Sequence, residues 1–469
     1  MDQISNNQVK PLIDKNTKTI VLVAFAIAAF FLSFMIQALN VALPTIGREF
    51  GASATVLNWM VTAYALSAAA FSVPFGRIGD IVGIKKIIII GTIIYTLSSA
   101  VAIFSFSSIM LIVCRSIQGI SAAMILVNCI AMITSMFPAE ERGRALGFNI
   151  TGVYLGSTVG PFLGGLLTGY FGWKGIFLVN IPISLAVLLL LLWKVKGEWC
   201  ECKGQKLDYT GWVIYGLALI ILMYGFSLLP APTGAILILI GIAGLWFFLR
   251  FENRVKSPLF NINIFRKNRT FIFSNLAALI NYCAVFAISF LLSLYLQYIK
   301  GLSPEYTGLI MIANPLLQSI LSPVAGRISD KIEPRKVASI GMALSCAGLL
   351  SFVFLTNDSS LWQVVIALIF IGTGFAFFLS PNTNALMSSV EPKYYGVASA
   401  SMSTMISIGQ MLSMGIMMVV MAIIMGRVTI TPEYYPAFLT SGKIGFIIFT
   451  AISFGGIFVS LFRGKNKVS

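Results

Sequence analysis

The chain has 469 residues, of which 58% are hydrophobic and only 10% are charged. A soluble domain this apolar could not cover its surface with polar groups, so the composition excludes an ordinary water-soluble enzyme and predicts a membrane protein. The net charge of +16 would suit a nucleic-acid-binding protein, but most Lys and Arg residues fall in alternate loops between apolar runs. That asymmetry is the positive-inside pattern of membrane proteins and excludes nucleic acid as the partner.

Apolar runs follow one another along the whole chain, and each is long enough to cross a bilayer. A hydrocarbon core of about 30 Å needs about 20 residues per helix. The sequence therefore predicts an all-α polytopic membrane protein with fourteen membrane-spanning helices and no barrel. The predicted spans are 19–40, 57–76, 86–105, 108–135, 145–169, 175–194, 210–229, 233–250, 270–296, 305–325, 336–355, 361–388, 395–425 and 442–462. We expect the run from Asn40 to Pro44 to close the first helix.

The even number of spans places both termini on one side, and basic residues at both ends make that side the cytoplasm. We predict five regions along the chain. These are a cytoplasmic segment 1–18, an N-terminal six-helix bundle 19–198, two extra helices with linkers 199–269, a C-terminal six-helix bundle 270–462 and a cytoplasmic tail 463–469. The localisation predicted is a cell (cytoplasmic) membrane.

A glycine–aspartate–basic motif occurs twice, once after the second span and once after the tenth. Its residues are Gly76, Asp80, Gly83, Lys85 and Lys86 in the first copy, and Gly326, Asp330 and Arg335 in the second. Glycines permit a tight turn and close helix approach, and Asp can pair with Lys, Arg or a helix N-terminus. Such contacts could hold one conformer of a cytoplasmic gate closed. The alternative is that any short cytoplasmic loop is basic, but a repeated spacing favours the gate.

Arg115 lies about seven residues inside the fourth span. A central Arg costs roughly 2.5–3.5 kcal/mol on insertion scales, so it needs a partner or a water-filled cavity. One interpretation is a cavity charge that gates ions or binds substrate; the other is an Arg bonded to backbone and to amides such as Gln37 or Asn40. Gln118 shares the face of Arg115. The candidate coupling and cavity residues are Arg115, Gln118, Gly119, Asn40, Gln37 and Tyr64.

The fifth span contains glycines at every fourth position, which form one stripe on a helix. The residues are Gly152, Gly156, Gly160 and Gly164, followed by Gly165, with Pro161 between them. A glycine stripe lets two helix backbones touch, and Pro161 removes one helical hydrogen bond. Simple helix packing is the alternative, but four repeats with a Gly-Pro favour a conformational pivot.

Polar and methionine residues of the second half are candidates for a substrate cavity. They are Asn281, Asn314, Gln318, Asn382, Met411, Met414 and Met418. Methionines spaced by three and four line one helical face and can serve promiscuous binding. Ordinary packing is the interpretation we favour for the methionines, and interhelical hydrogen bonding is an equal alternative for the amides.

Together these motifs resemble the major facilitator superfamily over essentially the whole chain, and its 14-helix drug:proton antiporter branch in particular. Residues 76–86 resemble its loop signature, Arg115-x-x-Gln118-Gly119 its fourth-helix signature, and 156–165 its fifth-helix antiporter signature. The resemblance implies two six-helix bundles plus two inserted central helices, alternating access, and export of amphipathic drugs against proton influx. It also implies that Arg115 governs coupling and that Asp80 locks the cytoplasmic gate.

The sequence departs from that family in its acidic residues. Met35 stands where relatives often carry an acid, none of the 16 acids lies mid-span, and the chain has no His. Proton coupling would then depend on a boundary acid such as Glu49, Glu305 or Asp80, on a proton carried by the substrate, or would be absent. A buried Arg without a buried carboxylate favours neutral or anionic amphiphiles over cations.

Other function classes lack their residues. No phosphate-binding loop is encoded, and without His or an acid cluster we expect neither an enzyme nor a metal or cofactor site. The alternative function is a major facilitator importer or uniporter of a nutrient or metabolite without proton coupling, because a fold does not fix direction. The predicted partners are a small-molecule substrate, protons and membrane lipid, and we expect a monomer.

Overall fold

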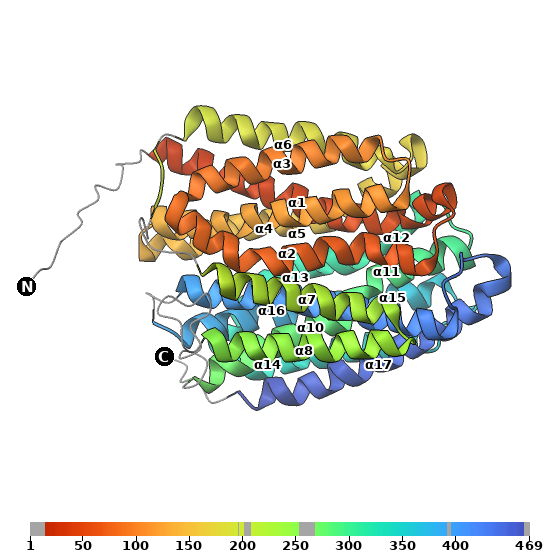
Figure 1. Cartoon of the computed structure of the whole chain (residues 1–469). Coiled ribbons are helices and arrows are strands. Elements are labelled where there is room, and N and C mark those ends of the chain that lie inside the picture. Colours follow the sequence, from red (N-terminus) through yellow and green to blue (C-terminus); the bar gives the residue numbers. More distant parts are fainter. Residues whose placement is uncertain (1–14, 196, 201–207, 253–267, 392–394, 464–469) are drawn as a thin grey trace, which may run out of the picture.

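The computed structural model describes residues 15–195, 197–200, 208–252, 268–391 and 395–463, and its described part consists of long helices without strands. The helices run side by side in one elongated bundle (Figure 1). We call the end at which the first helix begins and the last one ends the termini end, and the opposite one the far end. The expectation of an all-α polytopic membrane fold is confirmed.

Six helices form the first half. They are α1 (Lys15–Phe50), α2 (Ala54–Val82), α3 (Ile84–Ile103), α4 (Ser108–Met136), α5 (Ala139–Phe171) and α6 (Lys174–Lys194). Side-chain oxygens of Ser53 and Ser107 accept hydrogen bonds from the first turns of α2 and α4, which explains why these helices begin there. In Figure 1 these helices occupy the upper layer.

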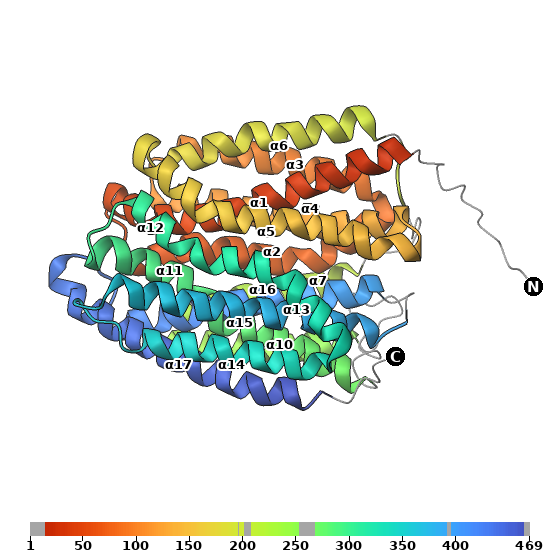
Figure 2. The same cartoon turned by 180° about the vertical axis from the view of Figure 1, so that it is seen from behind.

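The second half has the same number of spans, but two of them are broken. The ninth span comprises α10 (Arg269–Val285), α11 (Ala287–Leu294) and the π-helix η1 (Tyr295–Ile299); the tenth comprises α12 (Pro304–Met311) and α13 (Ala313–Lys331). The remaining helices are α14 (Pro334–Phe352), α15 (Leu361–Ser388), α16 (Tyr395–Ile424), the short 3-10 helix η3 (Pro432–Tyr434) and α17 (Tyr435–Leu461). They lie together in the lower layer of Figure 2.

Thirteen segments of the described chain are long and apolar enough to span a membrane. The remaining predicted span is α14, a 19-residue helix rich in serine and glycine that begins at Pro334 with Arg335 and Lys336. It is packed between α15 and α17, where small residues such as Gly341 and Gly348 let the backbones approach. Its small and polar residues, such as Ser339, Gly341, Ser345 and Gly348, are buried against its neighbours, while Ile340 and Leu350 on its outer face are exposed by 57% and 49%.

Two inserted helices, α7 (Tyr209–Leu228) and α8 (Pro232–Glu252), lie between the halves in sequence and form a hairpin. In space α7 packs against α2 of the first half and α16 of the second half. The hydroxyl of Tyr215 donates to the carbonyl of Ala69 at 3.3 Å, and Arg427, just after α16, donates to the carbonyl of Ser227 at 3.0 Å. The helix α7 therefore lies over the contact between α2 and α16 and is bonded to both halves.

The expectation that Asn40 to Pro44 closes the first helix is wrong, because α1 continues to Phe50. Pro44 removes one hydrogen bond of the helix but does not end it. Its own carbonyl accepts hydrogen bonds from Tyr298 at 3.1 Å and from Arg48 at 3.4 Å. Contacts with the second half and with the next turn thus support α1 through the proline.

Candidate functional site

The glycine stripe of α5 lies directly on the backbone of α1. A methyl group on Gly152 would lie 2.1 Å from the carbonyl oxygen of Ala26, and one on Gly156 would lie 2.2 Å from that of Phe30. Gly160 and Gly164 continue the contact along Gln37 and Ala38. Only glycine permits this approach, since real Cβ atoms do not come so near.

A second face of α5 touches the other half of the protein. A methyl group on Gly165 would lie 2.4 Å from the carbonyl oxygen of Pro304, and one on Gly308 of α12 would lie 2.1 Å from that of Pro161. Thr158 of α5 also donates to the carbonyl of Pro315 at 3.1 Å. Of the predicted pivot residues, Pro161 and Gly165 therefore lie where the two halves meet, whereas the four glycines of the stripe lie against α1 inside the first half.

Further hydrogen bonds join the halves toward the far end. Gln297 of η1 donates to the carbonyl of Val41 at 2.7 Å, and Asn58 of α2 donates to the carbonyl of Met414 at 3.1 Å. The guanidinium of Arg48 lies 5.8 Å from the ring centroid of Tyr298, which also bonds to α1. These contacts link α1 and α2 to η1 and α16, so the far end of the seam is closed.

Arg115 lies inside the first half, with 1% of its surface exposed. Its guanidinium donates to Gln118 Oε1 at 2.8 Å and to the carbonyl of Met60 at 3.3 Å, and it lies 4.3 Å from the ring centroid of Tyr64. Gln118 in turn donates to Ser99 at 2.9 Å. The acceptors are neutral, so the charge of Arg115 is solvated by dipoles and a ring rather than by a carboxylate.

The predicted coupling residues fall into two groups. Gln118 and Tyr64 contact Arg115, and Gly119 allows α4 to approach α2 because a methyl there would lie 2.3 Å from the carbonyl oxygen of Tyr64. Asn40 is buried and Gln37 half-buried, and neither is among the acceptors of Arg115 in the described hydrogen bonds. Tyr95 is buried near Arg115, and the buried amide of Asn180 lies beside its hydroxyl.

The first motif copy lies at the termini end between α2 and α3. Gly83 has φ of +132°, which favours glycine, and joins the two helices. The backbone amides of Lys85 and Lys86 donate to the two carboxylate oxygens of Glu198 at 2.8 and 3.2 Å. Asp80 lies half-buried in the last turn of α2. Glu198, which the sequence did not single out, therefore caps α3 from beyond α6.

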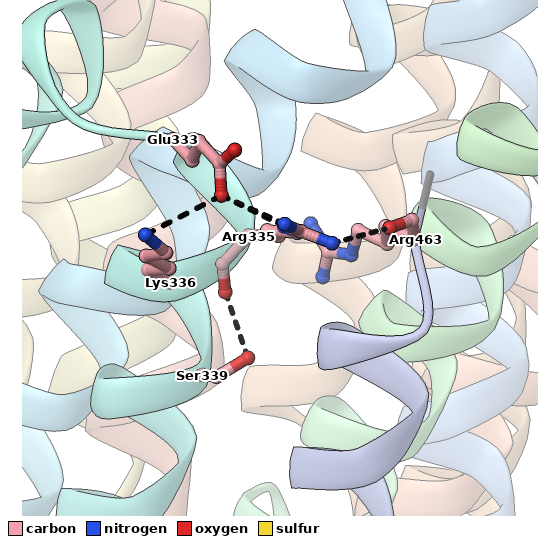
Figure 3. A network of polar contacts seen from close by, with 5 residues as sticks. All are labelled: Glu333, Arg335, Lys336, Ser339 and Arg463. Carbon is pink, nitrogen blue, oxygen red and sulfur yellow. Dashed lines mark hydrogen bonds and ion pairs between the residues drawn. The ribbon is translucent and has the colours of Figure 1, made fainter. Parts of the chain in front are cut away.

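The second motif copy lies at the same end, between α13 and α14. Gly326 faces Ser380 of α15, and Ser329 accepts a hydrogen bond from Asn384 at 3.2 Å. Arg335 forms an ion pair with Glu333 at 2.9 Å (Figure 3). The side chain of Asp330 lies outside the described part of the structure.

The candidate cavity residues of the second half occupy different surroundings. Asn281 is fully buried with both amide atoms unpartnered among described residues, whereas Asn382 donates to the carbonyl of Ser274 at 3.2 Å. Asn314 and Gln318 are half-buried on α13. The side chains of Met411, Met414 and Met418 are fully buried on α16.

An aromatic cluster at the seam was not singled out from the sequence. Tyr154 of α5 lies beside Tyr282 of α10 and Ser322 of α13. The ring of Tyr282 meets that of Phe375 edge to face, with centroids 5.0 Å apart. Tyr154 and Tyr282 are each half-buried. Only the position of Tyr154 inside the glycine run could have drawn attention to it.

Two acids lie at the far end. The carboxylate of Glu49 accepts a hydrogen bond from the indole of Trp173 at 2.6 Å. Glu305, in the first turn of α12, packs on α5, and a methyl on Gly169 would overlap its carboxylate. Within the described ranges, no three His, Cys, Asp or Glu residues gather in a way that could hold a metal ion.

Comparison with known proteins agrees with this arrangement. The family model of the Major Facilitator Superfamily matches residues 25–198 and 274–467. The multidrug resistance protein Stp of Mycobacterium tuberculosis is 30% identical over 416 residues, covering 87% of this chain and 76% of its own. The riboflavin transporter RibZ of Clostridioides difficile is 29% identical over 390 residues, covering 82% and 84% of the two chains.

Another relative is the methylenomycin A resistance protein of Bacillus subtilis, 27% identical over 409 residues and covering 84% of this chain and 86% of its own. Among solved structures, a bacterial homolog of the human lysosomal transporter Spinster matches with a TM-score of 0.68 and 17% identity, over 97% of this chain and all of that one. That structure shares the fold. On these matches and the paired six-helix halves, the chain is a transporter of the major facilitator superfamily.

Proposed function

We propose that this protein exports amphipathic drugs or toxic small molecules by alternating access, as a monomer in the cytoplasmic membrane with both termini in the cytoplasm. The observation that carries the proposal is the packing of α5. Its glycine stripe lies on α1, and its opposite face contacts α12 across the seam. A helix that contacts both halves through glycines can slide or tilt against its neighbours without rearranging side chains. The resistance proteins among the relatives support the direction of transport.

The substrate class follows from the charges around Arg115. The described partners of this buried cation are the neutral groups of Gln118, Met60 and Tyr64. An anionic substrate gains from that field, a neutral one tolerates it, and a cation is repelled. The half-buried rings of Tyr154 and Tyr282 at the seam add a surface for flat apolar groups.

For energy coupling we propose proton antiport through Glu305. This acid sits on α12 of the second half, while its contact surface at Gly169 belongs to α5 of the first half. Glu305 is half-buried here, and separation of the halves at the far end would remove its contact with α5 and expose it fully to water. Such alternating exposure is what a proton carrier requires.

The test is efflux of fluorescent amphiphiles from proteoliposomes. We expect a dye-loaded vesicle to lose a neutral or anionic dye faster when a pH gradient drives protons inward, and a matched cationic dye to be transported more slowly. Equal rates with and without the gradient would refute coupling, and faster transport of the cation would refute the charge preference. Arg115→Gln serves as the inactive control.

Uptake is the second candidate, because one relative is a riboflavin transporter. A deletion strain distinguishes the two directions. Increased sensitivity to a panel of amphipathic compounds supports export. Unchanged sensitivity with lost accumulation of one labelled metabolite, such as riboflavin, supports import.

A further inference from the structure

Arg463, two residues after the end of α17, is a buried cation that forms no ion pair with the described residues. Its side chain is 1% exposed, and its Nε, Nη1 and Nη2 atoms have no hydrogen-bond partner among the described residues. Burial lowers the pKa of the guanidinium to about 9. A guanidinium normally makes up to five hydrogen bonds, so leaving it buried and unpaired is strongly unfavourable.

The neighbouring charges do not neutralise Arg463. The carboxylate of Glu333 already pairs with Arg335 at 2.9 Å and with Lys336 at 3.7 Å. Arg335 reaches Arg463 only through the backbone carbonyl, at 3.5 Å. Figure 3 shows Arg335 between Glu333 and the backbone carbonyl of Arg463, so Arg335 and Lys336 share one carboxylate and Arg463 adds a third cation beside Arg335.

The backbone adds to this positive field. Helix α14 begins at Pro334, and the amino end of a helix carries a partial positive charge. Arg335 and Lys336 project from its first turn. Helix N-termini combined with cationic side chains bind phosphate groups in many proteins.

The site adjoins a surface that faces hydrocarbon. Phe458, Leu461 and Phe462 on the last turns of α17 and just after it are exposed by 47%, 44% and 58%. Lys336 is exposed at the edge of the site, with 61% of its side chain accessible. These exposed apolar residues directly precede Arg463 along the chain, so acyl chains and a basic group would lie close together there, as in basic headgroup pockets between transmembrane helices.

We propose that Arg463, Arg335 and Lys336 bind a phosphate-bearing anion, supplied by the headgroup of an anionic phospholipid whose acyl chains lie along α17. The phosphate oxygens accept bidentate hydrogen bonds from Arg463. Arg335 exchanges its contact with the carbonyl of Arg463 for one with the phosphate, since that contact, at 3.5 Å, is at the limit of hydrogen bonding. The site does not depend on transport direction or substrate.

The experiment measures thermal unfolding of the full-length protein in neutral detergent with phosphatidylglycerol, phosphatidylcholine or inorganic phosphate added. We expect phosphatidylglycerol to raise Tm by ~2 °C or more, and phosphatidylcholine to raise it less. In Arg463→Gln the shift should disappear, while Tm without lipid should equal or exceed that of the wild type because an unpaired buried charge is removed. Arg463→Lys, which keeps the charge but not the planar fork, should keep a smaller shift.

Arg250→Gln is the matched control. Arg250 also lies in the last turn of a lipid-facing helix, α8, and it stacks on Trp246 at 4.8 Å. This variant should keep the full phosphatidylglycerol shift. A shift produced equally by inorganic phosphate would support the phosphate site and assign it to a soluble anion. An undiminished shift in Arg463→Gln, an equal shift with phosphatidylcholine, or no shift in the wild type would overturn the proposal.

Discussion

The backbone amide of Lys85 donates to Oε1 of Glu198 at 2.8 Å, although the two residues are 113 positions apart. The segment after α6 is thereby fixed to the first turn of α3. The amide of Ile84 also donates to the carbonyl of Trp199 at 2.9 Å, and the ammonium of Lys85 donates to the carbonyl of Val195 at 2.5 Å. The basic residues of the first motif copy therefore hold a linker in place at the termini end.

Replacement of Glu198 by Ala should reduce the free energy of unfolding by about 1 kcal/mol, because two amides at the N-terminus of α3 lose their acceptor. Glu198→Gln retains one acceptor oxygen and should lose less. Differential scanning fluorimetry of the purified variants measures Tm and so ranks the stability of the wild type, Glu198→Gln and Glu198→Ala. The exposed Glu433, at the far end, supplies the control Glu433→Ala, which should leave Tm unchanged. An unchanged Tm in Glu198→Ala would show that the hydrogen bonds from Glu198 do not stabilise the protein.

Substitution of Gly156 by Ala should abolish transport, because the added methyl would lie 2.2 Å from the carbonyl oxygen of Phe30 and would force α5 away from α1. Gly147 on the same helix has open space around it. Gly147→Ala should therefore retain activity and gain up to about 1 kcal/mol of stability from helix propensity. Efflux rates normalised to membrane expression compare the pair, and similar activity of both variants would contradict the pivot.

Arg115→Gln should lose transport at least ~10-fold without lowering Tm, because the variant removes a buried charge whose described partners are all neutral. Tyr64→Phe keeps the ring 4.3 Å from the guanidinium and removes only a hydroxyl without a described partner. It should behave as the wild type. Tyr64→Ala removes a buried cation–π contact of about 2 kcal/mol and should lower Tm. A large fall in Tm for Arg115→Gln would indicate that Arg115 stabilises the fold and that the loss of transport is a consequence of unfolding.

Loss of the Tyr282 ring should weaken substrate binding about 5-fold, which corresponds to an aromatic contact of about 1 kcal/mol. Tyr282→Phe keeps the edge-to-face contact with Phe375 and should retain the wild-type KM. Tyr224, which is 52% exposed on α7, provides the control Tyr224→Ala. Concentration dependence of efflux separates KM from maximal rate, and an equal KM in Tyr282→Ala would place the substrate elsewhere.

Glu305→Gln should make efflux independent of an imposed pH gradient while substrate exchange at equal pH continues. Glutamine retains the shape that packs on Gly169 but cannot release a proton. Glu49→Gln, which keeps an acceptor for Trp173, is the comparison at the same end and should remain gradient-driven. If Glu305→Gln still responds to the gradient, another group carries the proton.

The overall fold was predictable because it rests on length and apolarity, which are local properties. Runs of about 20 apolar residues gave the spans, and glycines spaced by four gave a contact stripe that lies on α1. The end of α1 was wrong because the proline rule treats the helix alone, whereas Tyr298 and Arg48 bond to the carbonyl of Pro44. Tertiary contacts decided that boundary.

The parts of the site that the sequence missed depend on pairs far apart in the chain. In the sequence, nothing distinguishes Glu198 from other loop acids, Arg463 from other basic residues near the C-terminus, or Tyr282 from other aromatic residues of the spans. Their significance comes from partners: the amides of α3, the crowded cations at α14 and the ring of Phe375. Arg115 was recognised because a charge inside an apolar run stands out without any partner.

The position of α7 makes the two flanks of the transporter unequal. On one flank α2 and α16 are covered by the α7–α8 hairpin, bonded to both through Tyr215 and Arg427. On the other, α5 meets α12 and α13 with no inserted helix over them. In the described part of the chain, the inserted helices therefore separate the seam from lipid along α2 and α16 only, and we expect a compound dissolved in the bilayer to reach the seam more readily along α5 and α13.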